Sequence, residues 1–384
     1  MQVAATLQRF RSSSFAVGLL ALLAGSLLFT ACGGAGSDSV LSTSGEIEKL
    51  AASGDLVAAL TTHIAGSNDQ IVVWQPPGSQ VTRFVTGENV ANPESPIGYV
   101  SELALGSGRI AWLEIVGGNT VDDLLYAAPV GGGAATQLVW VTNTSGAEGG
   151  KEGDYAGQLL GAGPLLFYNQ WGVCSYNDSG DYRPTPECPV EGKVSGEQLV
   201  SIVAGRTEPV ASGPNAFQLV AVGGGWLAFE PVDTYGYTRC CTPGPIGATG
   251  TIRVTTAAAA PVSTVAAVPG DPPRAVALSA AHLLVERAST IDSYNPATGE
   301  HVGTIPLDGE LAGVNAQLAL LNGSDQLVLI RLSDGKRVTI PVSSGVVVNA
   351  KLTDAGLFYA YNVSSGSDKG RIVFESAARL LARF

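Results

Sequence analysis

Residues 279–305 read SAAHLLVERASTIDSYNPATGEHVGTI, and this stretch decides the fold. It opens with a turn of small residues and a short apolar run, SAAHLLVER at 279–287. A second run, Thr290–Tyr294, is followed by the turn NPATGE at 295–300 and by a third run, His301–Ile305. Short β-branched or apolar runs joined by turns that contain Asn and Gly predict antiparallel strands. Because the first run is apolar on both faces, the sheet must be covered on both sides.

The small turn followed by an apolar run occurs seven times along the chain. The copies are SGDLVAAL (53–60), GSGRIAWLE (106–114), GAGPLLFYN (161–169), GGGWLAFEP (223–231), SAAHLLVER (279–287), VNAQLALLN (314–322) and TDAGLFYAYN (353–362). Each copy follows a partner run, and in the clearest copies two more runs come after it, so the unit is four short strands. The last three copies are about 35–39 residues apart, close to the ~40–50 residues of a propeller blade. Insertions explain the longer spacings.

These features predict an all-β chain, folded as a seven-bladed β-propeller of four-stranded antiparallel blades over residues 45–384. A parallel α/β sheet is disfavoured because no long helical pattern separates the runs. The seventh blade shows only three evident strands. Its fourth strand is expected from Arg379–Phe384 or from the N-terminal Val40–Thr43, and the second choice would fix the N-terminal end into the ring. Either choice would remove an exposed sheet edge. Outside the leader, Ser376–Phe384 is the candidate helical stretch.

Two segments carry a resemblance to known proteins: SYNPATGEHVGTIPL at 293–307 and IRLSDGKRVTIPV at 330–342. Each contains an Asx, Ser/Thr and Gly turn followed by Glu or Lys. In this respect the chain resembles the bacterial β-propellers of the quinoprotein-like, YVTN-type and TolB-like group. The resemblance covers the predicted blades five and six and implies the fold. It implies no quinone cofactor and no site residue, because the tryptophan of the quinone-binding repeat is missing.

Residues 1–31 have the pattern of a lipoprotein signal peptide. Arg9 and Arg11 precede the apolar run Phe15–Phe29, which is too short to span a bilayer comfortably. The run ends Leu-Phe-Thr-Ala-Cys at 28–32, which resembles the bacterial lipobox. The resemblance implies that Cys32 is lipidated, palmitate being a typical acyl group, and becomes the new N-terminus. The alternative is an ordinary cleaved signal peptide with Cys32 nearby by chance.

The next segment, 32–44, is expected to be the lipidated Cys32 and a flexible tether. Its residues 33–39 are small or polar and show no apolar pattern. Each buried CH₂ of an acyl chain adds ~0.8 kcal/mol, so two or three chains would hold the protein to a membrane essentially permanently. We therefore expect a lipid-anchored protein on the extracytoplasmic side of a cell membrane or outer membrane.

The charge of the chain restricts its partners. The formal net charge is −12, the pI is near 4.7 and charged residues make up 14% of the chain. Binding to nucleic acid or to anionic headgroups needs clustered Lys and Arg, so neither is an expected partner. The low charged fraction also excludes a coiled coil and a disordered acidic tail. The expected partner is an unidentified extracytoplasmic protein or glycan, and the chain is expected to be a monomer.

Three long connections, 140–156, 171–195 and 231–249, fall between predicted strands of blades two to four. In a propeller, the connection from the second to the third strand and the link to the next blade lie on one face. The three segments are therefore expected to form one binding face. Its candidate contact residues are aromatic: Trp140, Trp171, Tyr176, Tyr182, Tyr235 and Tyr237. The leading hypothesis is a ligand-binding or protein-interaction scaffold with no enzymatic activity.

The same insertions contain every cysteine except Cys32, namely Cys174, Cys188, Cys240 and Cys241. An even number in an exported protein predicts disulfide bonds. One pairing joins Cys174 to Cys188 and closes a strained ring at Cys240–Cys241, and two pairings join the insertions. Pairing between the insertions is favoured because neighbouring cysteines in an extended chain point in opposite directions. Zinc binding is the competing interpretation, but the chain has no Cys-x-x-Cys pair or nearby His to support it.

The sequence contains no recognised catalytic motif, and no catalytic or metal residue is expected. The three histidines, His63, His282 and His301, belong to no metal or nucleophile motif. The oxygen-rich segment 177–181, with Glu187 as a distal ligand, is a weak calcium candidate whose alternative is a solvated turn. Otherwise no cofactor is expected. The alternative function is an extracellular enzyme that acts on glycan or peptide with carboxylates in the axial channel. Glu230, after the apolar run of blade four, is either a channel acid or a solvated rim residue.

Overall fold

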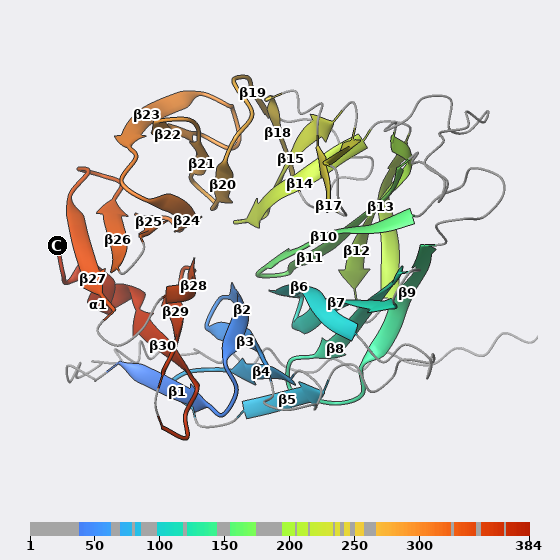
Figure 1. Cartoon of the computed structure of the whole chain (residues 1–384). Coiled ribbons are helices and arrows are strands. Elements are labelled where there is room, and N and C mark those ends of the chain that lie inside the picture. Colours follow the sequence, from blue (N-terminus) through green and yellow to red (C-terminus); the bar gives the residue numbers. More distant parts are fainter. Residues whose placement is uncertain are drawn as a thin grey trace, which may run out of the picture. The chain divides into compact units, whose positions relative to one another are not determined.

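The computed structural model arranges seven four-stranded antiparallel sheets as blades around a central axis (Figure 1). The prediction of a seven-bladed β-propeller is thereby confirmed. The structure describes residues 38–62, 70–78, 81–85, 98–117, 121–143, 154–173, 194–203, 206–213, 216–232, 235–238, 242–245, 250–256, 266–323, 326–342, 347–364 and 366–384.

In every blade, the first strand lies nearest the axis and the chain then runs outward. Blade 1 is β2 (Ile47–Ser53), β3 (Leu56–Thr61), β4 (Gln70–Trp74) and β5 (Val81–Val85), and blade 2 is β6 (Gly98–Gly106), β7 (Arg109–Gly117), β8 (Val121–Pro129) and β9 (Thr136–Asn143). Blade 3 is β10 (Asp154–Ala162), β11 (Leu165–Val173), β12 (Val194–Val203) and β13 (Arg206–Gly213), and blade 4 is β14 (Ala216–Gly223), β15 (Trp226–Val232), β18 (Ile252–Thr256) and β19 (Ala266–Val268). Blade 5 is β20 (Ala275–Leu278), β21 (Leu283–Glu286), β22 (Thr290–Tyr294) and β23 (His301–Pro306), and blade 6 is β24 (Glu310–Val314), β25 (Leu318–Asn322), β26 (Gln326–Arg331) and β27 (Arg337–Pro341). Blade 7 is β28 (Val347–Leu352), β29 (Gly356–Asn362), β30 (Gly370–Ser376) and, as its outermost strand, β1 (Ser39–Thr43).

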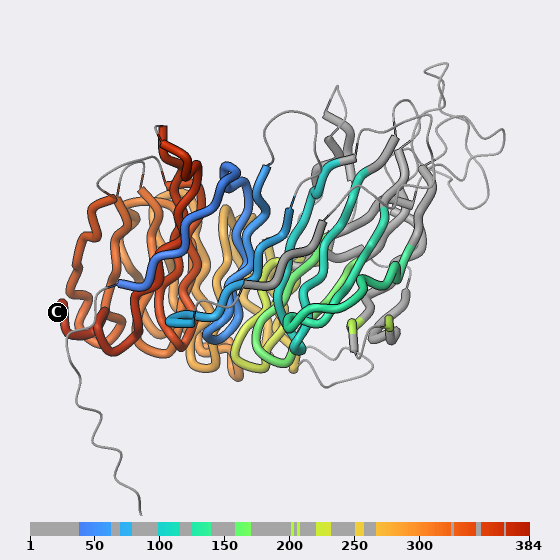
Figure 2. Tube along the Cα trace, turned by 90° about the horizontal axis from the view of Figure 1, so that it is seen from below, coloured from blue at the N-terminus to red at the C-terminus, as the bar shows by residue number. Residues whose placement is uncertain are grey.

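The N-terminal strand closes the ring. β1 pairs antiparallel with β30, with Ser39 opposite Phe374 and Thr43 opposite Gly370. Of the two closing strands considered from sequence, the N-terminal one is correct, and residues 39–43 belong to a blade. Figure 2 shows this blue strand against the red C-terminal part of the chain. The last residues instead form a short helix, α1 (Ala377–Leu381), within the stretch expected to be helical. Blade 7 therefore joins both ends of the chain.

The hydrophobic core lies between blades. One buried cluster combines Leu60 and Ile71 of blade 1 with Ile110, Trp112 and Tyr126 of blade 2. The rings of Trp112 and Tyr126 stack with centroids 5.6 Å apart. Other buried clusters lie between blades 2 and 3, 4 and 5, 5 and 6, 6 and 7, and 7 and 1. Covering of both faces by neighbouring blades explains why the second strands are apolar. None of the helices among the described residues is long and apolar enough to cross a membrane.

In two blades, the polar residue that ends the apolar run connects to the inner strand of the next blade. Glu286, at the end of β21, accepts a hydrogen bond from the backbone N–H of Leu311 in β24, at 2.7 Å. Asn362, at the end of β29, accepts one from the N–H of Ile47 in β2, also at 2.7 Å. Leu311 and Ile47 occupy corresponding positions, each just before a register shift in the inner strand of the next blade. These bonds give the Glu or Asn at the end of the repeat a structural role.

Candidate binding site in the axial channel

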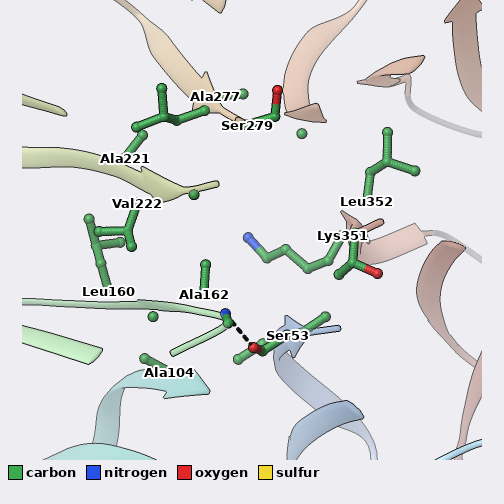
Figure 3. Close-up of a pocket in the computed structure, with 18 of the residues that line it drawn as sticks. Ser53, Ala104, Leu160, Ala162, Ala221, Val222, Ala277, Ser279, Lys351 and Leu352 are labelled. Carbon is green, nitrogen blue, oxygen red and sulfur yellow. Dashed lines mark hydrogen bonds between the residues drawn. The ribbon is translucent and has the colours of Figure 1, made fainter. Parts of the chain in front are cut away.

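The inner strands of all seven blades enclose an axial pocket with a volume of about 640 Å³ (Figure 3). Its walls are mostly small residues, among them Ala104, Ala162, Ala221 and Ala277. The pocket extends from the middle of the inner strands to the turns between first and second strands. Those turns gather around one mouth, so all seven inner strands run towards it. We call this end of the ring the pocket face.

A bulge recurs in these inner strands. The register shifts by one residue where the first strand pairs with the second in six blades, at Glu48, Ser101, 157–158, Val220, Ala312 and Val348. A bulge bends a strand and changes the direction of the following side chains. Lys49, Glu102 and Asn349 come directly after such a bulge, and all three line the pocket. The bulge is therefore the local feature that places polar side chains on the axis.

Four charged side chains line the pocket: Lys49, Glu102, Lys351 and Asp354. Figure 3 shows Lys351 extending from β28 across the cavity. Lys351 is half-buried, and lost hydration lowers the pKa of its ammonium, while the Glu102 carboxylate opposes that change. Lost hydration also raises the pKa of Glu102, and Lys49 and Lys351 offset part of the rise. Neither lysine forms an ion pair with a described carboxylate.

Hydrogen bonds between the turns hold the mouth of the pocket together. The Gly163 N–H of blade 3 donates to Ser53 Oγ of blade 1 at 2.7 Å, as the dashed line in Figure 3 shows. Thr353 Oγ1 of blade 7 donates to the Gly54 carbonyl of blade 1, also at 2.7 Å. Asn315 Nδ2 of blade 6 donates to the Thr353 carbonyl at 3.0 Å. These bonds fix the mouth, so the pocket is formed without a ligand.

Glu230 does not face the channel, and it is not a solvated rim residue. Its side chain is 3% exposed, and its Oε1 accepts a hydrogen bond from the Gly250 N–H at 2.7 Å. Burial raises the pKa of the carboxyl, while the Gly250 bond and Arg287 oppose the rise. Both interpretations of this residue were wrong because the second strand ends between blades, away from the axis. The carboxylates that reach the pocket are Glu102 and Asp354.

The predicted insertions leave the ring from the end opposite the pocket face. Asp154, Gly172 and Ser195 lie in one row across blade 3, at the start of its inner strand. In blade 4, Val232 lies opposite Ala216, again at the start of the inner strand. The third insertion contains a hairpin that the sequence did not predict, β16 (Tyr235–Thr238) with β17 (Thr242–Pro245). We call this end of the ring the insertion face.

The candidate contact residues fall partly within described strands. Trp140 belongs to β9, Trp171 to β11, and Tyr235 and Tyr237 to β16. Tyr176 and Tyr182 lie outside the described residues, so nothing here places all six aromatic residues together. The signal peptide, Cys32, the four insertion cysteines and the calcium candidate 177–181 also lie outside them. Among the described residues, no group of three or more His, Cys, Asp or Glu side chains could hold a metal ion.

Sequence reasoning missed Lys49, Glu102 and Lys351. A signal for them was present, since each is a charged residue inside the run that precedes a repeat copy. Such runs form the inner strands, where a charged side chain is buried between blades or projects into the channel. The chain has only six lysines, and two of them line this pocket.

No protein-family model and no curated protein sequence matches the chain. Solved structures resemble it. An acylaminoacyl peptidase from Pyrococcus horikoshii superposes with a TM-score of 0.54 at 12% identity, over 86% of this chain and 51% of the peptidase. An orthorhombic form of that peptidase gives 0.50 at 13% identity, over 83% and 49%. A chain of the mitotic checkpoint complex gives 0.48 at 14% identity, over 95% and 99%. At these identities the likeness shows the propeller fold alone.

Proposed function

We propose that this chain is a lipid-anchored propeller on the extracytoplasmic side of a membrane, where it binds a small ligand in its axial pocket without catalysing a reaction. The observation that carries the proposal is the pocket itself. Its walls come from all seven inner strands, and its volume lies within the ~300–1,000 Å³ of ligand sites. A ligand there would contact every blade.

The start of the propeller supports the anchoring. Asp38 precedes β1, and its Oδ1 pairs with Arg379 Nη1 of α1 at 2.8 Å. β1 begins opposite the end of β30, which places Asp38 on the pocket face. Five residues lie between Cys32 and Asp38, and this link spans at most ~20 Å when extended. A lipid on Cys32 would therefore hold the pocket face close to the membrane and turn the insertion face outward.

Fractionation of cells tests the anchor. A Cys32→Ala variant of the full chain should leave the membrane fraction and incorporate no labelled palmitate. The matched control Cys174→Ala should stay in the membrane fraction. Membrane retention of Cys32→Ala would refute lipid anchoring without bearing on the pocket.

Filling the pocket tests ligand binding. Ala162 lines the cavity, and an Ala162→Trp substitution would place an indole inside it (Figure 3). Ala297 is an exposed turn residue of blade 5, so Ala297→Trp is the matched control. The three proteins are purified from their own membranes and denatured, and the released small molecules are identified by mass spectrometry. A molecule released from the wild type and Ala297→Trp, but not from folded Ala162→Trp, supports the proposal. Identical small molecules from all three would contradict it.

The insertion face is a second candidate site, for a protein partner. The observation in its favour is that the strand ends bordering the insertions of blades 3 and 4 lie at the same end of the ring. We therefore propose that this face docks an extracytoplasmic protein. Replacing 233–249 by a short Gly-Ser linker should abolish co-purification of that partner and leave the small molecule of the pocket in place. Unchanged co-purification would refute this placement.

A further inference from the structure

Two lysines and two carboxylates line the axial pocket. Lys49 and Lys351 project into it together with one carboxylate, Glu102. Glu102 and the fourth charged group, the turn residue Asp354, are both exposed, so water and salt screen their charges, whereas both lysines are half-buried. The less exposed charges of the pocket are therefore positive, in a chain whose net charge is −12.

The two ammonium groups have no direct partner. Within the described part of the chain, no hydrogen bond or ion pair joins Lys49 or Lys351 to another side chain. Removing a charged group from water costs free energy unless a partner replaces the water. Burial lowers the pKa of Lys351, as this cost requires. An anion bound between the two lysines would supply the missing partner.

A neutral polar group lies on the same strand. Asn349 is two residues before Lys351 on β28, so both side chains are on one side of the strand. Asn349 lines the pocket, and its side-chain amide has no hydrogen-bonding partner among the described residues. Its amide can both donate and accept, which suits hydroxyl groups. By contrast, Ser53 and Thr353 are already engaged in bonds between turns.

We propose that the axial pocket binds a hydroxylated monocarboxylate, the chemistry of a sugar acid, with the carboxylate between Lys49 and Lys351 and the hydroxyls at Asn349. The inference rests on the pocket of the proposed function and names its ligand class. Glu102 sets the charge preference, since its carboxylate would repel a dianion such as phosphate more strongly than a monoanion. The cavity of about 640 Å³ is also much larger than an inorganic ion.

Titration calorimetry with the full chain in detergent tests the ligand class, with D-glucuronate as probe and D-glucose and inorganic phosphate as comparisons. Glucuronate should bind more tightly than either. Lys351→Met and Lys49→Met should weaken its binding at least tenfold, whereas Lys336→Met, on an exposed outer turn, should leave it unchanged. Glu102→Gln should tighten it several-fold at pH 7. The wild type should bind more tightly as the pH falls from neutral towards the raised pKa of Glu102, because protonation of Glu102 removes the repulsion.

Each contrary result overturns the inference. Loss of binding in Glu102→Gln together with unchanged binding in Lys351→Met would identify a cation pocket. Equal binding of glucose and glucuronate would remove the role of the lysines, and tighter binding of phosphate would identify a phosphate site. Absence of glucuronate binding by a folded protein would refute the ligand class. In that case, the proposed function would still stand if a different small molecule were released from the wild type and Ala297→Trp but not from Ala162→Trp.

Discussion

The side-chain amide of Asn362 holds both backbone polar groups of Ile47, a residue 315 positions earlier in the chain. Asn362 Oδ1 accepts from the Ile47 N–H at 2.7 Å, and Asn362 Nδ2 donates to the Ile47 carbonyl at 3.0 Å. The contact joins blade 7 to blade 1, where the ring closes. Ile47 itself is 1% exposed, so its backbone groups have little access to water. The closure therefore depends on hydrogen bonds from one side chain as well as on the pairing of β1 with β30.

Replacing Asn362 by Ala should lower the free energy of unfolding by about 2 kcal/mol, because two backbone groups at a buried position lose their partners. Asn349→Ala is the matched control, since Asn349 is an inner-strand asparagine whose side chain has no hydrogen-bonding partner among the described residues. Urea denaturation of both variants measures the difference. Equal midpoints for the two variants would show that the Asn362 contact contributes nothing to ring closure.

Neighbouring blades approach so closely near the axis that certain positions admit only glycine. A Cβ added to Gly223 of β14 would lie 2.0 Å from the Leu278 carbonyl oxygen of β20. Because that atom belongs to the backbone, the two blades would have to separate. Gly223→Ala should therefore cost about 3 kcal/mol of stability. Gly303 of β23 has no atom within 4 Å of such a Cβ, so Gly303→Ala should be neutral or slightly stabilising. Thermal unfolding of the two variants distinguishes these outcomes, and similar midpoints would contradict the argument.

The sequence predicted those parts of the fold that depend on local pattern. The runs Thr290–Tyr294 and His301–Ile305, joined by an Asn and Gly turn, form the hairpin of β22 and β23. One predicted alternative for the closing strand, Val40–Thr43, is part of β1. For the hairpin, turn chemistry and two short runs carry the information, which needs no knowledge of distant contacts. The closing strand was only one of two alternatives, because its partner β30 lies at the other end of the chain.

The candidate site could not be predicted in the same way. Lys49, Glu102 and Lys351 come together only because three inner strands from distant parts of the chain surround one axis. Glu230 was placed near the channel from its position after an apolar run, but such positions lie between blades. Glu102 faces the channel and Glu230 does not. This difference depends on the bulge before Glu102 and on the closed ring of blades, and neither is visible in a local sequence pattern.

The C-terminal helix is fixed to blade 7 by a charge pair. Glu375 is 2% exposed, and its two oxygens accept from Arg383 Nε at 2.6 Å and Arg383 Nη2 at 3.0 Å. Arg383→Gln would leave this buried carboxylate with only the longer contact to Arg379, and should cost about 2–3 kcal/mol. Arg337→Gln is the control, because Arg337 pairs with exposed Asp308 and such pairs contribute about 0–1 kcal/mol. Chemical denaturation gives both values, and a loss in Arg383→Gln no larger than in the control would rule out the proposed fixation.

The lowered pKa of Lys351 has a direct chemical consequence. An amine acylates only in its neutral form, so the acetylation rate of Lys351 should reach half its maximum below the usual pH of an exposed lysine. The Glu102 carboxylate favours the charged ammonium and so raises this pKa. Glu102→Gln removes that charge, and the midpoint for Lys351 should therefore move to still lower pH.

Brief acetylation of the full chain across a pH series, with each lysine quantified by peptide mass spectrometry, measures the midpoint. The Lys336 peptide from the same digest monitors the activity of the reagent. A midpoint that moves upward in Glu102→Gln, or does not move, would mean that Lys351 and Glu102 do not interact electrostatically across the pocket. The role proposed for Glu102 in selecting the charge of the ligand would then be refuted.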